Sequence, residues 1–238
     1  MRTSGWMKRQ SWFWPAKLFL KRISGKELWL RLEVVVATVE TADWTYIGSR
    51  LDSDSIVYSL GVGDSIEFDL DLIGRFGLTV FAFDPTPFSA RWVQKQTLPR
   101  KFLFRPWAVS GENGNLRLFR RVNSQGRSAK VMWTADKCAG DPDDFIDAPA
   151  YTVQKIMELL QHEKISLLKM DVEGAEYGIL DGFKNMAQLP EQLLVEFHHR
   201  FPGIGKKRTA DSIEMLSRLG YKIFGISETG REIGFVLD

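Results

Sequence analysis

The sequence predicts an α/β fold in which a mostly parallel, doubly wound sheet is covered by helices on both faces. First, strand-like and helix-like segments alternate from residue 56 onward, as the right-handed crossovers of a parallel sheet require. Second, the runs at 79–83 and 165–170 are largely apolar, which is typical of strands buried on both faces. Third, the last two strand-like runs are joined by residues 227–231 alone, too short a link for a crossover helix, so they predict a C-terminal antiparallel hairpin.

The first elements of this fold are bounded by turn-forming residues. In order, we expect a strand at 56–60, a helix at 65–76, a strand at 79–83, a short helix at 88–96 and a strand at 102–109. Pro85 and Pro87 close the second strand because proline cannot continue a sheet ladder. Between 111 and 150 the pattern is weaker: 116–130 indicates a hairpin and 140–144 a loop. This segment either shapes a binding pocket or is a solvated hairpin.

Regular periodicity returns after residue 150. Apolar residues at Val153, Ile156 and Leu160 fall on one face of a helix predicted over 153–162. After this helix we expect a strand at 165–170, a helix from about 175, a strand at 192–197, a helix at 209–219, and closing strands at 221–226 and 232–237.

Composition and charge exclude several classes of protein. Charged residues make up 26% and the net charge is only +2, so the chain lacks the basic excess of a dedicated nucleic-acid binder. Its single cysteine, Cys138, excludes an intramolecular disulfide and a cysteine-rich zinc cluster. No run approaches the roughly 18 to 20 apolar residues of a membrane span, and the sequence does not begin with a signal-peptide pattern. We therefore expect a cytoplasmic protein.

The chain is expected to divide into a basic, aromatic extension at 1–50 and one α/β domain at 51–238. Within 1–31, basic residues greatly outnumber the lone acid, Glu27, and alternate with aromatic residues. The basic residues are Arg2, Lys8, Arg9, Lys17, Lys21, Arg22, Lys26 and Arg31, and the aromatic ones are Trp6, Trp12, Phe13, Trp14, Phe19 and Trp29. The extension packs on the domain or a sister subunit, makes peripheral contact with an anionic membrane, or binds nucleic acid.

The strand ends hold the first candidates for binding, because open parallel sheets bind ligands beyond the carboxyl ends of their strands. Gly61 and Gly63 would allow a tight turn and a close approach to a ligand. Asp84 ends the next strand about 20 residues later, where nucleotide-binding folds place an acid that accepts ribose hydroxyls. Its alternative role is to cap the following helix. Ile66 stands where a dinucleotide fingerprint requires a third glycine, which favours an adenosine without phosphates.

A second motif carries a family resemblance. Residues 168–176 read Leu-Lys-Met-Asp-Val-Glu-Gly-Ala-Glu, and this segment resembles the strand-four signature of the FkbM-type S-adenosylmethionine-dependent methyltransferases. Supporting segments are 57–64, 82–87, 107–109 and 194–198, and the resemblance covers about residues 50–237. It implies a Rossmann-like class I methyltransferase fold, S-adenosylmethionine as cofactor, and O-methylation of a hydroxyl on a sugar or other small metabolite.

The resemblance also assigns roles to individual residues. The cofactor-binding residues would be Tyr58, Gly61, Gly63, Asp84, Trp107 and Ala108. The catalytic candidates stand at strand ends: Asp171 and Glu173 follow the strand at 165–170, and His198 follows the strand at 192–197, two residues after Glu196. The resemblance and the alternation with Glu196 favour His198 over His199. Many methyltransferases place an acid where this chain has Ser59, so contacts to the methionine part of the cofactor would come from elsewhere, such as Asp64 or Asp171. Two further residues receive structural roles: Glu176 serves the N-terminus of the next helix, and His199 lies at the surface.

Several alternatives stay open at the level of sequence. A divalent metal held by Asp171, Glu173 and His198 would also activate a hydroxyl, because carboxylates and one imidazole suit such ions. A nicotinamide-dependent oxidoreductase shares the glycine turn and the ribose acid, and a non-catalytic membrane-surface protein would use the N-terminal aromatic and basic residues. The sequence identifies neither the methyl acceptor nor the oligomeric state.

Overall fold

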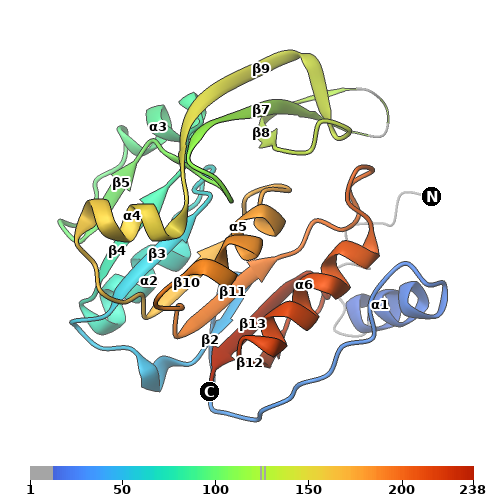
Figure 1. The fold of residues 1–238 in the computed structure, drawn as a ribbon, viewed down its shortest axis with the longest axis horizontal. Coiled ribbons are helices and arrows are strands. Elements are labelled where there is room, and N and C mark those ends of the chain that lie inside the picture. The colour runs from blue at the N-terminus through green and yellow to red at the C-terminus, as the bar shows by residue number, and fades with distance from the viewer. Residues whose placement is uncertain (1–12, 124, 126) are drawn as a thin grey trace.

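Seven strands form the central sheet of the described chain (Figure 1). They are β3 (Ile56–Leu60), β4 (Thr79–Phe83), β5 (Phe102–Arg105), β10 (Leu167–Met170), β11 (Gln192–Glu196), β12 (Tyr221–Ile226) and β13 (Glu232–Leu237). Their spatial order is β12-β13-β11-β10-β3-β4-β5. The strands from β11 to β5 run parallel, whereas β13 is antiparallel to both β11 and β12. The order reverses between β3 and β10, so the switch point where ligands bind lies at the carboxyl ends of these two strands.

The structure is a computed structural model that describes residues 13–123, 125 and 127–238. Of the N-terminal residues that the sequence singles out, Arg2, Trp6, Lys8, Arg9 and Trp12 lie outside the described residues. Within the described part, no helix combines the length and the apolar character that crossing a membrane requires.

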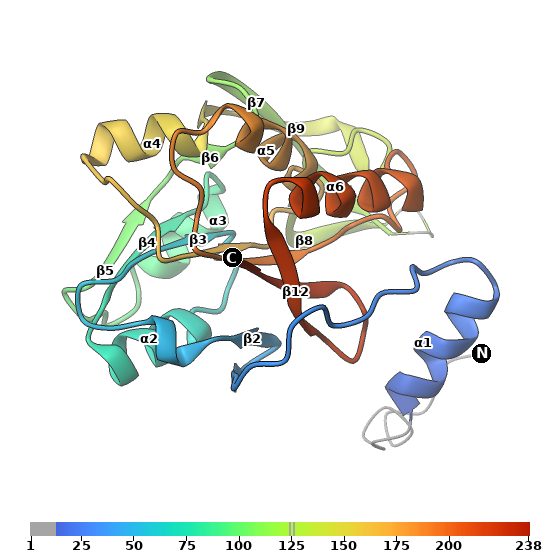
Figure 2. The same cartoon turned by 60° about the horizontal axis from the view of Figure 1, so that its bottom comes forward.

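Helices cover the sheet on both faces (Figure 2). One face carries α4 (Val153–Leu160), α5 (Glu176–Gly182) and α6 (Lys206–Arg218), and the other carries α2 (Glu67–Phe76). Strands β1 (Val39–Thr41) and β2 (Trp44–Tyr46) form a small antiparallel hairpin on the α2 side. Short helical turns occupy Gly48–Arg50 and Phe183–Asn185, and α3 (Pro87–Val93) follows β4. The mixed α/β fold with a mostly parallel sheet therefore agrees with the sequence prediction.

Two of the helices, α3 and α4, begin at capping threonines. Thr152 precedes α4 and its hydroxyl accepts a hydrogen bond from the Lys155 amide at 3.1 Å. Thr86 caps α3 in the same way, and Pro87 occupies the first helical position, where a missing N–H costs nothing. Helix α2 ends at Gly77, whose φ of 63° is the left-handed conformation that glycine adopts most readily.

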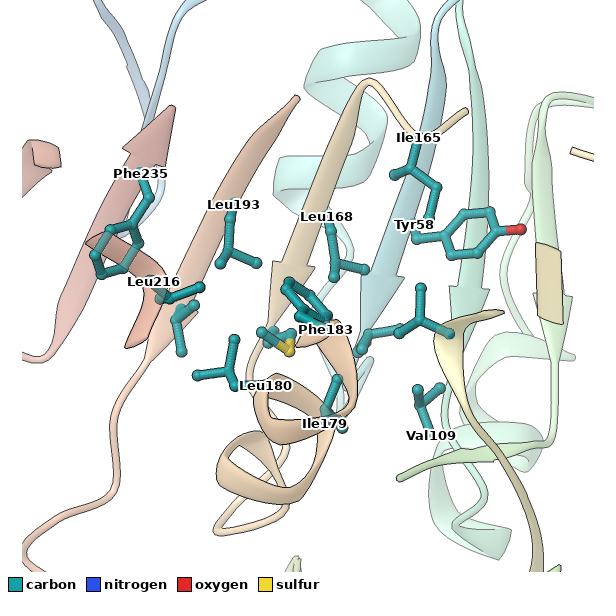
Figure 3. Close-up of a cluster of buried hydrophobic side chains, with 14 of the residues drawn as sticks. Tyr58, Val109, Ile165, Leu168, Ile179, Leu180, Phe183, Leu193, Leu216 and Phe235 are labelled. Carbon is teal, nitrogen blue, oxygen red and sulfur yellow. The ribbon is translucent and has the colours of Figure 1, made fainter. Parts of the chain in front are cut away.

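Two hydrophobic clusters, one on each face of the sheet, join it to the helices that cover it. Figure 3 shows the cluster under α5, where Leu180 and Phe183 face Leu168 and Leu193 of the neighbouring strands. The opposite cluster joins α2 and β2 to the sheet, and includes Tyr46, whose ring is fully buried. Because side chains alternate along a strand, each parallel strand contributes to both clusters, which explains their nearly continuous apolar sequences.

A second, four-stranded sheet lies over the carboxyl edge of the first (Figure 1). Its strands are β6 (Ala108–Val109), β7 (Gly114–Val122), β8 (Ser128–Thr134) and β9 (Gly140–Tyr151), in the order β6-β9-β7-β8. The strand predicted at 102–109 is thus two strands in two sheets. The loop predicted at 140–144 is wrong, because these residues begin β9 and pair with β7, and Asp144 also forms an ion pair with Arg120.

The N-terminal segment is tied to the domain by buried charge. After α1 (Phe13–Ile23), Glu27 is buried and accepts hydrogen bonds from His199 Nε2 at 3.0 Å and Arg200 Nε at 2.5 Å. Burial acts to raise the pKa of Glu27, but these two partners outweigh it and lower the pKa to about 2. The packing role proposed for the extension therefore holds for this residue, whereas membrane contact stays a prediction.

The segment at 39–51 is part of the domain core, although the sequence division placed most of it in the extension. Trp44, Tyr46, Ile47 and Leu51 are buried in the cluster beneath α2. The backbone of Ile47 also exchanges two hydrogen bonds with the buried amide of Gln192, at 2.8 and 3.2 Å. The β1–β2 hairpin is thereby fixed against the sheet.

Candidate functional site

A pocket of about 330 Å³ lies at the carboxyl edge of the sheet, at the topological switch point. Its floor is formed by the residues that follow β3, β4 and β10. One wall comes from the second sheet, through side chains such as Leu118 and Met132, and another comes from Ala42, Asp43 and Trp44 at the tip of the β1–β2 hairpin. The segment at 111–150 therefore shapes the pocket, one of the two roles the sequence left open.

The turn after β3 brings the backbone close to β10. Gly61 has a φ of +85°, and a Cβ at this position would lie 1.8 Å from the carbonyl oxygen of Asp171. Gly63 has a φ of +56° and faces open space. Gly61 is therefore required by packing against the protein itself, while Gly63 leaves room beside the pocket.

Asp84 lies in the pocket wall, but its carboxylate is already engaged by the protein. Oδ2 accepts hydrogen bonds from the amides of Val62 and Gly63, both at 3.0 Å, and from the Ser89 hydroxyl at 2.8 Å. Oδ1 accepts from the amide and the hydroxyl of Thr86 at 2.9 and 2.6 Å. A carboxylate has about four lone-pair sites, so these contacts fill it. The helix-capping alternative describes much of this geometry, and ribose binding stays a prediction.

Trp107 and Ala108 line the pocket, as predicted for the adenine side. The Trp107 ring stacks on Phe83, with the centroids 6.1 Å apart and the planes at 29°. Ala108 is buried beside them. These side chains form a flat apolar surface, which suits a planar heteroaromatic ring.

Tyr58 is placed away from this pocket. Its side chain points from β3 into the cluster under α4 and α5 (Figure 3), where its hydroxyl lies 2.8 Å from His162 Nδ1. Tyr58 stands two residues before the end of β3, with its side chain on the sheet face that α4 and α5 cover, so it does not line the pocket. Its predicted contact with the cofactor therefore has no support in the geometry.

The catalytic candidates meet at the far end of the pocket floor. His198 Nε2 lies 3.6 Å from Glu173 Oε2 and 4.0 Å from Asp171 Oδ1. Asp171 and Glu173 line the pocket, whereas His198 is only 5% exposed and lies behind them. Glu196 is also close, with Oε1 3.9 Å from the same imidazole nitrogen. The structure thus gathers all three predicted catalytic residues together with Glu196.

Contacts from the second sheet hold Glu173 in an unfavourable backbone conformation. Its side chain pairs with Arg121 of β7 at 3.1 Å, and its carbonyl oxygen accepts a hydrogen bond from the Thr134 hydroxyl at 2.6 Å. Its φ of +47° is an unfavourable backbone conformation for a residue with a Cβ. The contacts from the second sheet hold this conformation, and they place the carboxylate at the pocket.

The environment changes how these groups ionise. Burial acts to lower the pKa of His198, but contact with Glu176 and the charges of Glu173 and Glu196 outweigh it and raise the pKa to about 9. Burial, then repulsion from Asp171, raises the pKa of Glu196 to about 8. Burial also raises the pKa of Glu173. At neutral pH His198 is therefore an imidazolium, which makes it a poor proton acceptor.

Glu176 has its predicted place at the start of α5 and a further role, whereas His199 lies elsewhere than predicted. Glu176 is fully buried, and it accepts hydrogen bonds from the amides of Gly174 at 2.9 Å and His198 at 2.8 Å, so it joins two loops in addition to standing in the first turn of α5. His199 is buried against Glu27, so the prediction that it lies at the surface is wrong. The contact between His199 and Glu27 joins residues 172 positions apart, which a local sequence pattern does not reveal.

A metal ion has a candidate site among these side chains. Asp171, Glu196 and His198 offer ligand atoms within 4.8 Å of one another, and carboxylates with an imidazole suit divalent ions. Glu173, which the sequence placed in this set, pairs with Arg121 instead. Arg231 also forms an ion pair with Glu196 and competes with a cation there. Metal binding stays a prediction, with Glu196 in place of Glu173.

Two pocket residues received no role from the sequence, although Lys169 stands within the motif at 168–176. Asp69 and Lys169 are both buried and both line the pocket. The signal for Asp69 was present, because position 69 is three residues from Ile66 and Leu72 and so falls on the apolar face of its helix. An acid on that face needs a partner or a function.

A glycine turn, an aromatic wall and a carboxylate cluster at the switch point of a seven-stranded mixed sheet define a methyltransferase-like α/β protein. Residues 49–223 match the family model described as the methyltransferase FkbM domain, and the chain belongs to this family. Searches of curated proteins and of solved structures found no significant match.

Proposed function

We propose that this protein is an S-adenosylmethionine-dependent O-methyltransferase acting on a hydroxyl of a sugar or other small metabolite. The observation that carries the proposal is the pocket, in which the glycine turn and aromatic wall stand at one side and Asp171 and Glu173 at the other. The strand order is also the one expected of the class I methyltransferase fold. The family match favours this reading over a nicotinamide-dependent oxidoreductase.

The residues present fit the proposed cofactor. Trp107 and Phe83 offer a flat apolar surface for adenine, and Gly63 leaves space for close approach of a ligand. Asp84 shapes the glycine turn through the amides of Val62 and Gly63, and would have to exchange a protein donor to meet a ribose hydroxyl. When bound, S-adenosylmethionine supplies a sulfonium methyl group whose carbon–sulfur bond breaks with both electrons passing to sulfur.

Glu173 is the residue we assign to accept the hydroxyl proton of the acceptor. Burial raises the pKa of Glu173 toward neutral pH. A carboxylate with a pKa nearer the operating pH is a stronger general base. Asp171, more exposed at 37%, orients the acceptor hydroxyl from the same edge. His198 is charged and positions the two carboxylates by attraction. This assignment changes the role of His198 from base to positioning residue.

Glu173→Gln tests this assignment, because it keeps the shape of the side chain and removes its basicity. We expect kcat to fall by about 100-fold or more, with the affinity for the methyl donor changed less than about 3-fold. The assay measures transfer of a labelled methyl group from S-adenosylmethionine to a panel of hydroxylated acceptors. Glu158→Gln, an exposed acid of α4, is the matched control. Undiminished turnover in a folded Glu173→Gln variant would remove Glu173 from the chemistry.

A further inference from the structure

Asp69 is a buried carboxylate in the pocket wall whose charge is only partly compensated. It comes from the first turn of α2, is 2% exposed, and lines the pocket. Its Oδ1 atom has no hydrogen-bond partner within the described residues. An unpaired buried carboxylate is costly, so its persistence at a pocket points to a ligand that supplies the missing donor.

The opposite charge stands nearby on the same pocket wall. Lys169 of β10 is buried, and its ammonium donates to the Gly61 carbonyl at 3.0 Å and lies 5.3 Å from the centre of the Trp44 ring. It affects Asp69 through charge, without a hydrogen bond between them. One of the three donors of Lys169 is used by Gly61, which leaves capacity for a further acceptor.

The surroundings strengthen this pair of charges. Trp44 and Phe68 both line this part of the pocket, with ring centroids 6.3 Å apart, so the charges lie in an apolar setting. The Ser59 hydroxyl is near enough to favour the ionised form of Asp69, yet it too has no hydrogen bond of normal geometry within the described chain. Burial raises the pKa of Asp69 and outweighs the charge of Lys169, the Ser59 hydroxyl and the backbone, which act to lower it.

We propose that Asp69 and Lys169 form a subsite for a zwitterionic α-amino acid group, with Asp69 accepting from its ammonium and Lys169 donating to its carboxylate. The inference rests on the proposed function, since the methionine end of S-adenosylmethionine is such a group. It assigns the cofactor an orientation, with the amino acid end toward the β1–β2 hairpin and the adenine toward Trp107. It also gives the hairpin tip a binding role, although Trp44 precedes the segment matched by the family model.

Calorimetric binding of paired ligands tests the subsite. S-adenosylmethionine carries the whole amino acid group, decarboxylated S-adenosylmethionine lacks the carboxylate, and methylthioadenosine lacks the entire group. In Asp69→Asn we expect the affinity for S-adenosylmethionine to fall by about 10- to 100-fold, the scale of a charge-assisted hydrogen bond, while methylthioadenosine binds as it does to the wild type. Wild-type protein should bind the decarboxylated analogue about 10-fold more weakly. Glu67→Gln, an exposed acid on the same helix turn, is the matched control and should change neither affinity.

The outcomes separate the subsite from the function. Equal affinity of Asp69→Asn and wild type for S-adenosylmethionine overturns the subsite, and so does an equal loss for both ligands, which would mean a structural role. If Asp69→Asn does not fold, wild-type protein that binds a deaminated analogue as well as S-adenosylmethionine has the same consequence. Wild-type protein that binds methylthioadenosine but gains nothing from the amino acid group contradicts the subsite alone. Wild-type protein that binds none of these ligands contradicts the proposed function itself.

Discussion

Asp84 and Asp69 are two buried aspartates that line one pocket, yet they differ in almost every contact. Asp84 accepts hydrogen bonds at both oxygens from the glycine turn and the start of α3. Asp69 leaves Oδ1 without a donor and stands near a lysine that does not bond to it. The fold supplies donors to both oxygens of Asp84, whereas the described residues leave Oδ1 of Asp69 without one.

An acid at the end of a strand is therefore not shown to contact a ligand by its position alone. Asp84 follows a strand, as the expected ribose acid should, but its donors are already provided by the chain. Asp69 lies in a helix and fits no motif, but it carries the unsatisfied atom. The state of the hydrogen-bond acceptors is therefore the more informative observation about binding.

The largest loss of stability should come from Asp84→Ala. The change leaves the amides of Val62, Gly63 and Thr86 without their acceptor, and each orphaned buried group costs about 1–3 kcal/mol. We expect the free energy of unfolding to fall by about 3–5 kcal/mol, measured by urea denaturation. Asp64→Ala, an exposed acid of the same turn, is the control and should cost about 0.5 kcal/mol or less. A stable Asp84→Ala variant that loses only cofactor affinity would restore Asp84 as a ligand-binding acid.

A smaller change in stability should come from the cluster around His198. Its acids share one imidazolium, so their charges are compensated less fully than that of Asp84 and more fully than that of Asp69. The raised pKa values of His198, about 9, and Glu196, about 8, mean that the folded state holds more protons than the unfolded state. The His198 contribution is fully present below its ordinary pKa of 6.5 and is lost as the pH rises to about 9, and Glu196 acts in the same direction from 4.5 to 8.

We therefore expect the free energy of unfolding to decrease by on the order of 2 kcal/mol between pH 6.5 and 9. His198→Gln should make this decrease smaller, because it removes one of the two groups that titrate. Denaturant unfolding at several pH values measures both. A stability that rises over this range in the wild type would show that the carboxylates do not hold His198 in its charged form.

The smallest expected effect is that of Asp69→Asn on stability in the absence of ligands. The carboxylate is buried without full compensation, so replacing it with a neutral amide should leave the melting temperature unchanged or raise stability by up to about 1 kcal/mol. Differential scanning calorimetry compares the variant with Asp84→Ala directly. A loss as large as that of Asp84→Ala would show that Asp69 supports the fold and would remove the contrast between the two residues.

Much of the fold was predictable because it depends on local pattern. The strands at 56–60, 79–83, 221–226 and 232–237 occur at the expected residues, since apolar runs bounded by glycine, proline and polar turns leave few alternatives. The second sheet was only half predicted. The start of β9 holds turn-forming residues, and only the pairing with β7 makes it a strand, which a local pattern does not contain.

The candidate site shows the same division. Asp171 and Glu173 were found because they follow an apolar strand, and the structure places both in the pocket. The burial of His199 depends on Glu27, which lies 172 positions earlier in the chain, and no spacing rule connects them. The ionised state of His198 likewise depends on Glu173 and Glu176, which lie more than 20 positions earlier in the chain. Contacts between distant segments decide what the sequence alone left out.

The central claim is that the pocket binds S-adenosylmethionine, and titration calorimetry of the wild-type protein tests it most directly. The protein is titrated with S-adenosylmethionine and, separately, with NAD under the same conditions. We expect saturable one-to-one binding of S-adenosylmethionine with a Kd in the micromolar range and no binding of NAD. Saturable binding of NAD, with no heat from S-adenosylmethionine, would contradict it.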